Sequence, residues 1–324
     1  MTATAAELSS SGLPEEPVRR GLVLAAVLVT VVAWASAFVA IRGIQATFDP
    51  GALALGRLAV GSAALSLAVL VRRSWVRPTR PEWGRIVVCG VAWFAVYNVA
   101  LNAAERRVDA GTAAMLVNVG PILIALLAGA VLGEGLPRWL LLGAGVAFSG
   151  ALLIGAATAS AEGSDAVGVV LCLLAALSWA IGVMAQKPVL RRLPALQVTM
   201  LACLVGTVVC LPFTGGLVAD GRDASAGALL ALVYLGLVPT ALAFGTWAYA
   251  LSRMSAGRLG VSTYLVPPLT VLMAWPLLRE APPRLALVGG ALALAGVGLT
   301  RRKDRPRDQA GDQAGDQAQD QARD

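Results

Sequence analysis

The sequence predicts an all-α integral membrane protein whose ten transmembrane helices form two inverted five-helix repeats. Three observations support this fold class. The 324 residues are 57% hydrophobic and 14% charged, with a mean hydropathy of +0.74, whereas about a quarter of the residues of a soluble domain are charged. Ten apolar runs are long enough to cross a bilayer, and part of the first half of the chain recurs in the second half.

The ten predicted helices follow one another along most of the chain. A helix of roughly 17 to 25 apolar residues spans a hydrocarbon core about 30 Å thick. Runs that are apolar on all sides favour helices over the alternating strands of a membrane β-barrel. We place the helices at 22–41, 51–71, 84–104, 110–133, 138–157, 167–186, 196–213, 226–250, 258–278 and 285–300.

The first run is predicted to be an uncleaved helix rather than a signal peptide. Arg19 and Arg20 precede it, and Ala35-Ser36-Ala37 imitates a cleavage site. However, the run is longer than a secretory h-region and continues through that site.

Basic residues are distributed unequally between the two predicted sides of the membrane. With a cytoplasmic N-terminus, the cytoplasmic segments hold 19 of the 26 Lys and Arg residues and the outer segments hold six. Positive charge favours the cytoplasmic side, so both termini are predicted to be cytoplasmic. The net charge of +7 therefore reflects orientation and not a nucleic-acid partner. Because 24 Arg against 2 Lys with abundant Ala is typical of a high-GC bacterial genome, we expect the bacterial cytoplasmic (inner) membrane.

The repeat is clearest where GPILIALLAGAVLGEGLPR, at 120–138, recurs as VPPLTVLMAWPLLREAPPR, at 266–284. Over 110–153 and 256–299, at a constant offset of 146, 15 of 44 positions are identical. The rarer residues among them are Pro121 with Pro267, Glu134 with Glu280, Pro137 with Pro283, and Arg138 with Arg284. Because five helices are an odd number, the second unit enters the membrane from the opposite side, as in the inverted repeats of secondary transporters.

The repeat divides the chain into four predicted parts. Residues 1–20 form a cytoplasmic segment, 21–158 and 159–302 form the two five-helix repeats, and 303–324 form a low-complexity tail that begins its DQAG-like repeat at Asp308. The tail has little to bury and is predicted to be disordered.

The chain resembles the EamA-type members of the drug/metabolite transporter superfamily over about residues 20–302. The resemblance is carried by WASAF at 34–38, by ALGRLAVGSAALSL in the second helix, by AGTAAMLVNVGPILIALLAGAVLGEGLPR across the fourth and fifth helices, and by AGRLGVSTYLVPPLTVLMAWPLLREAPP across the ninth and tenth helices. It implies ten helices in two repeats, transport and often export of a metabolite, and a cavity lined by the first, third, fourth, sixth, eighth and ninth helices.

Arg57 is the one ionisable residue that clearly falls within a predicted span. An Arg near the middle of a membrane helix costs roughly 2.5 to 3.5 kcal/mol on insertion scales, so carbonyls, neighbouring helices or an anionic substrate must stabilise it. Both a structural role, in which the side chain snorkels, and a substrate-binding role are open.

Polar side chains of the third helix follow one face. Asn98, Asn102 and Glu105 are spaced by four and three residues. The amides either bind a substrate or join neighbouring helices. Asn98 lies deeper and is the candidate for the cavity.

The fourth and ninth helices carry matched candidates. Asn118 corresponds to Tyr264, and each precedes a mid-helix proline, Pro121 or Pro267, by three residues. Proline removes a backbone donor and bends a helix, and bent helices form sites and gates in transporters. Prolines are also tolerated in membrane helices as simple bends.

Aromatic residues complete the predicted substrate site. Trp34 and Trp179 occupy equivalent positions of the two repeats at an offset of 145, and Tyr97 lies in the third helix. Phe244 and Trp247 share a face of the eighth helix with Thr240. The alternative for such residues is anchoring at the membrane interface.

No metal, cofactor or catalytic group is expected. The chain has no histidine, and its four cysteines fall in apolar runs without C-x-x-C spacing. Glu134 and Glu280 lie in helix connections, where they are expected to bond amides of the next helix. Without a carboxylate deep in a span, a proton relay is not expected, and uniport, exchange or coupling through the substrate's charge are open.

The expected function is alternating-access transport, with export favoured, of a small polar or amphipathic metabolite such as an amino acid. A cationic drug exporter is the alternative within transporters. A membrane enzyme lacks a catalytic motif, and a scaffold would scatter its polar residues. Small residues of the fifth helix, namely Gly143, Ala147, Ala151 and Gly155, form a packing face that leaves a homodimer open.

Overall fold

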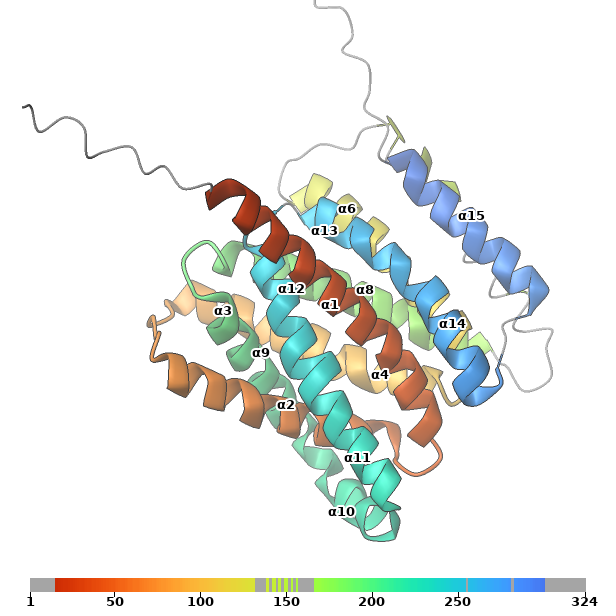
Figure 1. The fold of residues 1–324 in the computed structure, drawn as a ribbon, viewed down its shortest axis with the longest axis horizontal. Helices are drawn as coiled ribbons and strands as arrows, with labels where there is room; N and C mark the ends of the chain where they lie inside the picture. Colours follow the sequence, from red (N-terminus) through yellow and green to blue (C-terminus); the bar gives the residue numbers. More distant parts are fainter. Residues whose placement is uncertain are drawn as a thin grey trace, which may run out of the picture.

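A computed structural model of the chain is built from helices (Figure 1). The structure describes residues 15–131, 138, 139, 142, 143, 145, 146, 149, 150, 153, 156, 166–254, 256–280 and 283–300. Every regular element within these ranges is helical. The predicted low-complexity tail, Glu134, and most of the predicted fifth helix with its small-residue face lie outside the described residues.

The helices have the following bounds. They are α1 Glu15–Ile44, α2 Pro50–Arg72, α3 Arg80–Cys89, η1 Gly90–Val96, α4 Tyr97–Ala104, α5 Ala110–Val117, α6 Gly120–Val131, α8 Ala166–Val189, α9 Ala195–Cys210, η2 Leu211–Phe213, α10 Thr214–Asp223, α11 Ala226–Leu235, η3 Gly236–Leu242, α12 Ala243–Leu251, α13 Ala256–Ser262, η4 Thr263–Leu265, α14 Val266–Leu278 and α15 Arg284–Thr300. The segments η1 and η3 are π-helices, and η2 and η4 are short 3-10 helices.

Seven continuous helical stretches of the described chain are long and apolar enough to cross a membrane. They are Gly21–Ile44, Pro50–Arg72, Arg80–Ala104, Ala110–Leu127, Ala166–Val189, Ala195–Asp223 and Ala226–Leu251. Two shorter apolar helices, Thr263–Leu278 and Leu287–Gly296, follow. The predicted all-α membrane fold is therefore confirmed.

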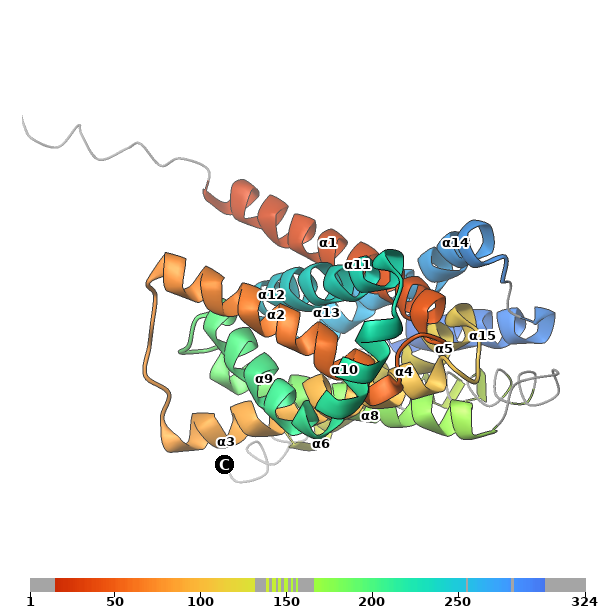
Figure 2. The same cartoon turned by 90° about the horizontal axis from the view of Figure 1, so that it is seen from below.

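Helices from distant parts of the sequence lie side by side in the bundle. α1 packs against α12 and α14, α2 packs against α9, and α4 packs against α8. Figures 1 and 2 show the same bundle from two directions, with α15 at its edge. Large apolar side chains such as Leu70, Leu230 and Trp275 face outward and are about 70% exposed, as expected for helices whose solvent is lipid.

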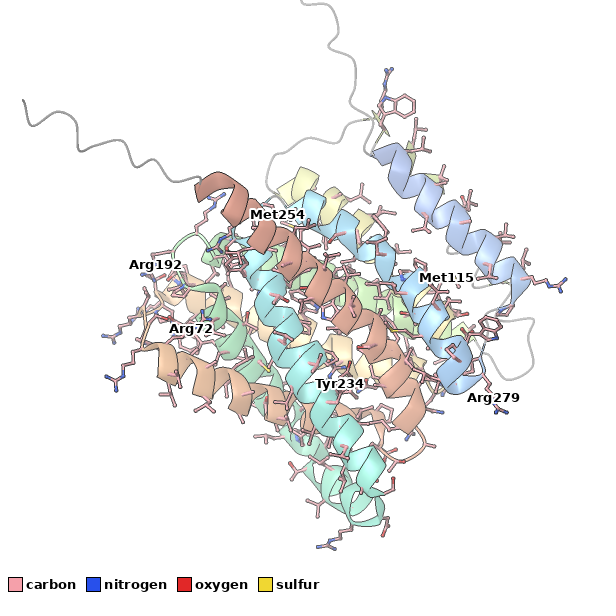
Figure 3. The ribbon with its side chains drawn as sticks, viewed as in Figure 1. Arg72, Met115, Arg192, Tyr234, Met254 and Arg279 are labelled. Carbon is pink, nitrogen blue, oxygen red and sulfur yellow. The ribbon has the colours of Figure 1, made fainter. Side chains whose placement is uncertain are left out.

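Charged side chains gather at the two ends of the bundle. Figure 3 shows Arg72 and Arg192 at one end and Arg279 at the opposite end, with apolar side chains between them. At the first end, Arg192 forms an ion pair with Glu82, which also accepts a hydrogen bond from the backbone N–H of Thr79 at 2.7 Å. The arrangement leaves an apolar band between two charged ends, as a spanning protein requires.

The two π-helices occupy equivalent positions of the sequence repeat. Gly90–Val96 and Gly236–Leu242 have the same length and are separated by the offset of 146. In each, the backbone ladder shifts by one residue, so the helix widens in the middle of a membrane span.

Each π-helix begins with a glycine that lets a neighbouring helix approach closely. A Cβ on Gly90 would lie 2.5 Å from Val205 Cβ, and a Cβ on Gly236 would lie 2.5 Å from Val60 Cβ. Val60 and Val205 are themselves 145 positions apart. Each contact therefore joins one half of the chain to the other, and the repeat relates the two contacts to each other.

The fourth and ninth predicted helices are both interrupted immediately before their prolines. α5 ends at Val117 and α6 begins at Gly120, so the break falls at Asn118 and Val119. The ninth helix passes from α13 to α14 through the 3-10 turn Thr263–Leu265. Pro121 and Pro267 each lie in the first turn of the following helix, where the missing backbone N–H leaves no bond unmade.

Basic residues at the end of the first helix of each half hold the chain at equivalent places. Arg42 donates to the carbonyl oxygen of Glu105 at 2.5 Å. Lys187 donates to the carbonyl oxygens of Leu251 and Met254 at 2.5 and 2.7 Å. Positions 105 and 251 differ by the offset of 146, so these anchors also follow the repeat.

Replacing Gly236 by alanine should destabilise the protein by roughly 1–3 kcal/mol, because overpacking at a close helix crossing displaces backbone. The added methyl group would lie 2.9 Å from the carbonyl oxygen of Arg57. The midpoint of thermal unfolding in detergent, followed by tryptophan fluorescence, should fall. The matched control is Gly245→Ala, where no atom lies within 4 Å. Equal midpoints for the two variants would contradict the close-crossing interpretation.

Candidate functional site

Six aromatic side chains meet at the centre of the bundle. This aromatic cluster consists of Trp34 on α1, Trp93 and Phe94 on η1, Trp179 on α8, and Phe244 and Trp247 on α12. Trp34 contacts four of the others, with ring centroids 5.0 Å from Trp247, 5.5 Å from Phe244, 5.9 Å from Trp179 and 6.1 Å from Trp93. Edge-to-face and tilted pairs at these separations attract one another beyond simple burial.

A small cavity of about 30 Å³ lies beside the cluster. Trp34, Trp93, Trp179 and Phe244 form its aromatic wall, and its polar side chains are Arg57, Tyr97, Asn118 and Thr263. This volume accommodates about one water molecule, so the centre is closed in this conformation.

Arg57 points into the bundle and does not snorkel. The residue is 2% exposed, and its Nε donates to Thr240 Oγ1 at 3.1 Å. Its two terminal nitrogens make no hydrogen bond to a described residue, and the side chain lines the central cavity. The structure thus brings a buried guanidinium against the aromatic cluster.

The acceptor for Arg57 is created by the π-helix η3. Pro239 has no backbone N–H, so it cannot donate to the carbonyl of Leu235 four residues earlier. The hydroxyl of Thr240 donates to that carbonyl oxygen at 2.8 Å, which turns the hydroxyl's lone pairs toward Arg57. The Thr240 hydroxyl therefore bonds both the π-helix backbone and the buried guanidinium of Arg57.

The two helix breaks meet at the cavity. Thr263 Oγ1 donates to Asn118 Oδ1 at 3.3 Å, and the two residues are 145 positions apart. Trp34 and Trp179 are also 145 positions apart and contact each other. Trp34 and Trp179, which the sequence repeat relates, thus meet beside the contact between the two helix breaks.

Several buried polar atoms at the centre have no partner. The indole nitrogens of Trp34, Trp179 and Trp247 are buried without a hydrogen bond to a described residue. A buried unpaired donor costs roughly 1–3 kcal/mol, and such donors are typical of places where water or a ligand binds.

The structure gathers most, but not all, of the predicted site residues around the cavity. Trp34, Arg57, Tyr97, Asn118, Trp179 and Phe244 line it. Trp247 belongs to the aromatic cluster behind the wall. Asn98 is buried, and its amide donates to the carbonyl oxygen of Phe94 at 2.7 Å, so it bonds the backbone of the π-helix η1.

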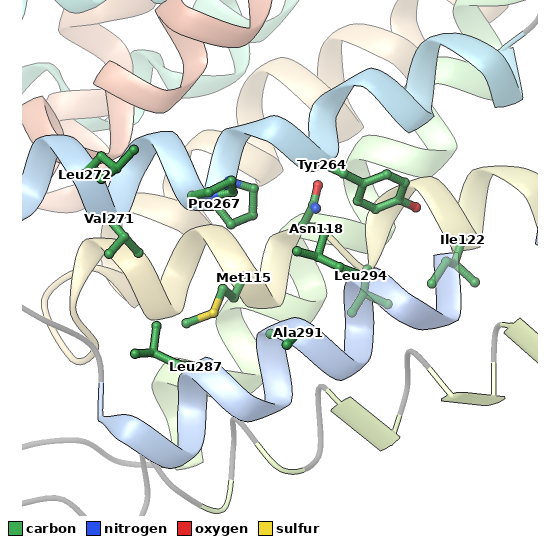
Figure 4. Close-up of a pocket in the computed structure, with 13 residues that line it drawn as sticks. Met115, Asn118, Ile122, Tyr264, Pro267, Val271, Leu272, Leu287, Ala291 and Leu294 are labelled. Carbon is green, nitrogen blue, oxygen red and sulfur yellow. The ribbon is translucent and has the colours of Figure 1, made fainter. Parts of the chain in front are cut away.

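Tyr264 and Pro267 line a second, larger cavity (Figure 4). This cavity of about 380 Å³ lies between α5, α14 and α15 and is walled chiefly by apolar side chains such as Met115, Leu287 and Leu294. Asn118 lines both cavities. The break at Asn118 therefore separates the central cavity from an apolar space at the edge of the bundle.

Glu280 forms an ion pair with Arg42, which the sequence analysis did not predict. Its carboxylate accepts two hydrogen bonds from Arg42 Nε, at 2.8 and 3.1 Å. The ion pair joins the end of α1 to the segment after α14, and 21% and 28% of the two side chains are exposed. The repeat relates Arg42 to Lys187, which is the sequence signal that could have indicated this role.

Sequence reasoning missed Trp93, Phe94 and Thr263, and it placed Glu105 on the polar face of the third helix without predicting its burial. Nothing in the sequence separates Trp93 and Phe94 from membrane-interface aromatics, because their position depends on the π-helix. Glu105 follows the span Arg80–Ala104 and is fully buried, although no buried carboxylate was expected. Parts of the chain that are distant in sequence bury its side chain. A local sequence pattern does not predict such tertiary contacts.

Thr240→Val should destabilise the protein by roughly 1–3 kcal/mol, because valine keeps the shape but leaves the buried Nε of Arg57 without its acceptor. The free energy of unfolding can be measured by titrating the protein from mild-detergent into SDS micelles. Thr214→Val is the control, since Thr214 is exposed and bonds one nearby carbonyl. If Thr240→Val lowers the free energy of unfolding no more than Thr214→Val does, the hydrogen bond between Thr240 and Arg57 does not stabilise the protein.

Comparison with known proteins identifies the family. The model of the EamA-like transporter family matches residues 20–156 and again 166–302. A "Probable terminal-alkyne amino-acid exporter" of Streptantibioticus cattleyicolor is 40% identical over 281 residues, covering 86% of this chain and 93% of that protein. An uncharacterized transporter of Bacillus subtilis is 34% identical over 272 residues, covering 83% of this chain and 88% of that protein.

Two more distant similarities agree with this result. A "Probable amino-acid metabolite efflux pump" of Salmonella typhimurium is 28% identical over 213 residues, covering 63% of this chain and 71% of that protein. A crystal structure with 21% identity covers 88% of this chain and 97% of its own, with a TM-score of 0.61, and so shares the fold. The chain is a multi-pass membrane protein that belongs to the EamA-like transporter family.

Proposed function

We propose that this protein exports a small amino acid across the bacterial cytoplasmic membrane by alternating access. The observation that carries the proposal is the buried guanidinium of Arg57, which faces a cavity walled by tryptophans. The names of two relatives, an amino-acid exporter and an amino-acid metabolite efflux pump, support the same substrate class. The proposed activity is transport without covalent chemistry.

Arg57 is the proposed anchor for the substrate carboxylate. A guanidinium presents donors in a planar fork that matches a carboxylate. Nε is held by Thr240, while the two terminal nitrogens make no hydrogen bond to a described residue. A carboxylate there would also offset the cost of burying the cation.

The aromatic cluster is the proposed pocket for the substrate side chain. Trp34, Trp93 and Phe244 offer flat apolar faces next to Arg57, and such faces fit a small apolar or unsaturated group. The unpaired indole N–H groups of Trp34 and Trp179 are available donors for carboxylate oxygens that Arg57 does not bond. A cationic drug fits less well, because Arg57 places positive charge at the cavity.

Binding requires movement, because the central cavity is too small for an amino acid. We infer that the repeats 21–158 and 159–302 rock about the contact between Trp34 and Trp179, with both termini cytoplasmic. The breaks before Pro121 and Pro267 are the proposed bending points, since each interrupts the backbone ladder of a helix that borders the cavity. Asn118 and Thr263 would separate or rejoin as the halves move.

Arg57→Gln should lower the initial rate of substrate uptake into inverted membrane vesicles by about 10-fold or more, since charge-assisted hydrogen bonds contribute roughly 1.5–3 kcal/mol. The probe is labelled propargylglycine, a small amino acid with a terminal alkyne. Arg85→Gln, which removes an exposed arginine of α3, is the control and should transport normally. Wild-type vesicles that move none of a panel of small amino acids would overturn the proposed substrate class. Normal transport by Arg57→Gln would overturn the anchor.

A further inference from the structure

Glu105 carries a buried carboxyl group that forms no ion pair with any residue the structure describes. It is the first residue after α4 and is 0% exposed. Neither carboxyl oxygen has a hydrogen-bond partner among the described residues. The backbone oxygen of the same residue does have one, the guanidinium of Arg42 at 2.5 Å.

The charged and titratable groups around Glu105 come from every element packed near it. Those that interact with it electrostatically are Arg42, Arg57, Tyr97, Asp109, Cys172 and Glu280. The side chain of Arg42 is bound by Glu280, and Nε of Arg57 is bound by Thr240. Among the described residues, no cation makes an ion pair with the Glu105 carboxyl group.

An ionised carboxylate in this position would be costly. The effective penalty for burying an unpaired ion is several kcal/mol, and a carboxyl group avoids it by remaining protonated. Burial accordingly raises the pKa of Glu105 well above its ordinary value, with Glu280 and Asp109 adding to the rise and Arg42 and Arg57 opposing it. The direction of this shift agrees with the cost of ionising a buried carboxyl group that lacks an ion-pair partner.

Glu105 lies one helical turn beyond the proposed substrate site. Tyr97 and Leu101 of α4 line the central cavity, and Glu105, the residue after α4, continues their four-residue spacing without lining the cavity itself. Arg57 interacts electrostatically with both Tyr97 and Glu105. The cavity thus offers a fixed positive group, Arg57, and just beyond its lining lies a buried carboxyl group without an ion-pair partner among the described residues.

We propose that Glu105 is the proton-binding site of the transporter and that it exchanges its proton for the ammonium group of the substrate. The proposal rests on the proposed function, with the substrate carboxylate at Arg57. On binding, the O–H bond of Glu105 breaks, the proton leaves to the cytoplasm, and the carboxylate pairs with the ammonium ion. On the outer side the ammonium leaves and a proton from outside takes its place.

The exchange balances in charge and in atoms. One proton enters the cell for each zwitterionic amino acid that leaves, and no other bond changes. Because the two cations compete for one carboxylate, the inward proton gradient drives export. This mechanism supplies the coupling that the sequence alone left open.

The first test needs no substrate. Infrared spectra of the purified protein at neutral pH should contain the carbonyl stretch of a protonated carboxyl group, and Glu105→Gln should remove it. Asp223→Asn, which changes an exposed carboxyl group, is the control and should leave the band in place. A wild-type spectrum without the band, or a band that persists in Glu105→Gln, would overturn the proton site.

The second test follows protons during binding. Calorimetry of propargylglycine binding in two buffers of different ionisation enthalpy should give release of about one proton per ligand in the wild type, as linkage requires. Pent-4-ynoate, which has the carboxylate and alkyne but no ammonium, should release none, and Glu105→Gln should release none with either ligand. Glu105→Asp keeps a carboxyl group and should retain the release.

The two proposals fail in different ways. If the wild type binds propargylglycine without releasing a proton, Glu105 is not the exchange site, while the proposed function stands. If the wild type binds no amino acid, the proposed function fails, and the exchange at Glu105 fails with it even if the infrared band is present.

Discussion

The hydrogen bond from Arg57 to Thr240 is the contact on which the centre of this protein depends. A guanidinium inside a membrane bundle must be held by polar groups, and an apolar helix offers few. The chain provides one in η3, where the Thr240 hydroxyl donates to the Leu235 carbonyl and its oxygen accepts from Arg57. The widened π-helix, the close crossing at Gly236 and the cavity beside the aromatic cluster all adjoin this contact.

The two halves of the chain share a backbone plan but differ in their side chains at the site. The π-helices, the glycine crossings, the helix breaks and the basic anchors recur at offsets of 145 or 146. At the same offsets, Arg57 corresponds to Ala202, Thr240 to Phe94, and Glu105 to Leu251. A symmetric backbone suits the proposed alternation between two related shapes, and the unsymmetrical polar residues are the groups proposed to orient a zwitterionic substrate.

Much of this plan could be predicted from the sequence, and the reasons for the failures are physical. Hydropathy identified the spans, and the paired prolines marked the helix breaks, because both effects are local. The π-helices depend on tertiary packing, so Trp93 and Phe94 were missed, and Asn98 was assigned to the cavity although it bonds the carbonyl of Phe94. The sequence allowed Arg57 either to snorkel to the membrane surface or to be buried. The structure shows that its side chain is buried between neighbouring helices. Glu105 follows the end of its span, and only the fold shows that other elements bury it.

The most direct test of the central claim is an experimental structure of the protein with a small amino acid bound. We expect the ligand carboxylate against the terminal nitrogens of Arg57, with the side chain among Trp34, Trp93 and Phe244 and the Thr240 hydrogen bond kept. Ligand density in the apolar cavity around Met115 and Leu287, with no contact to Arg57, would contradict the account.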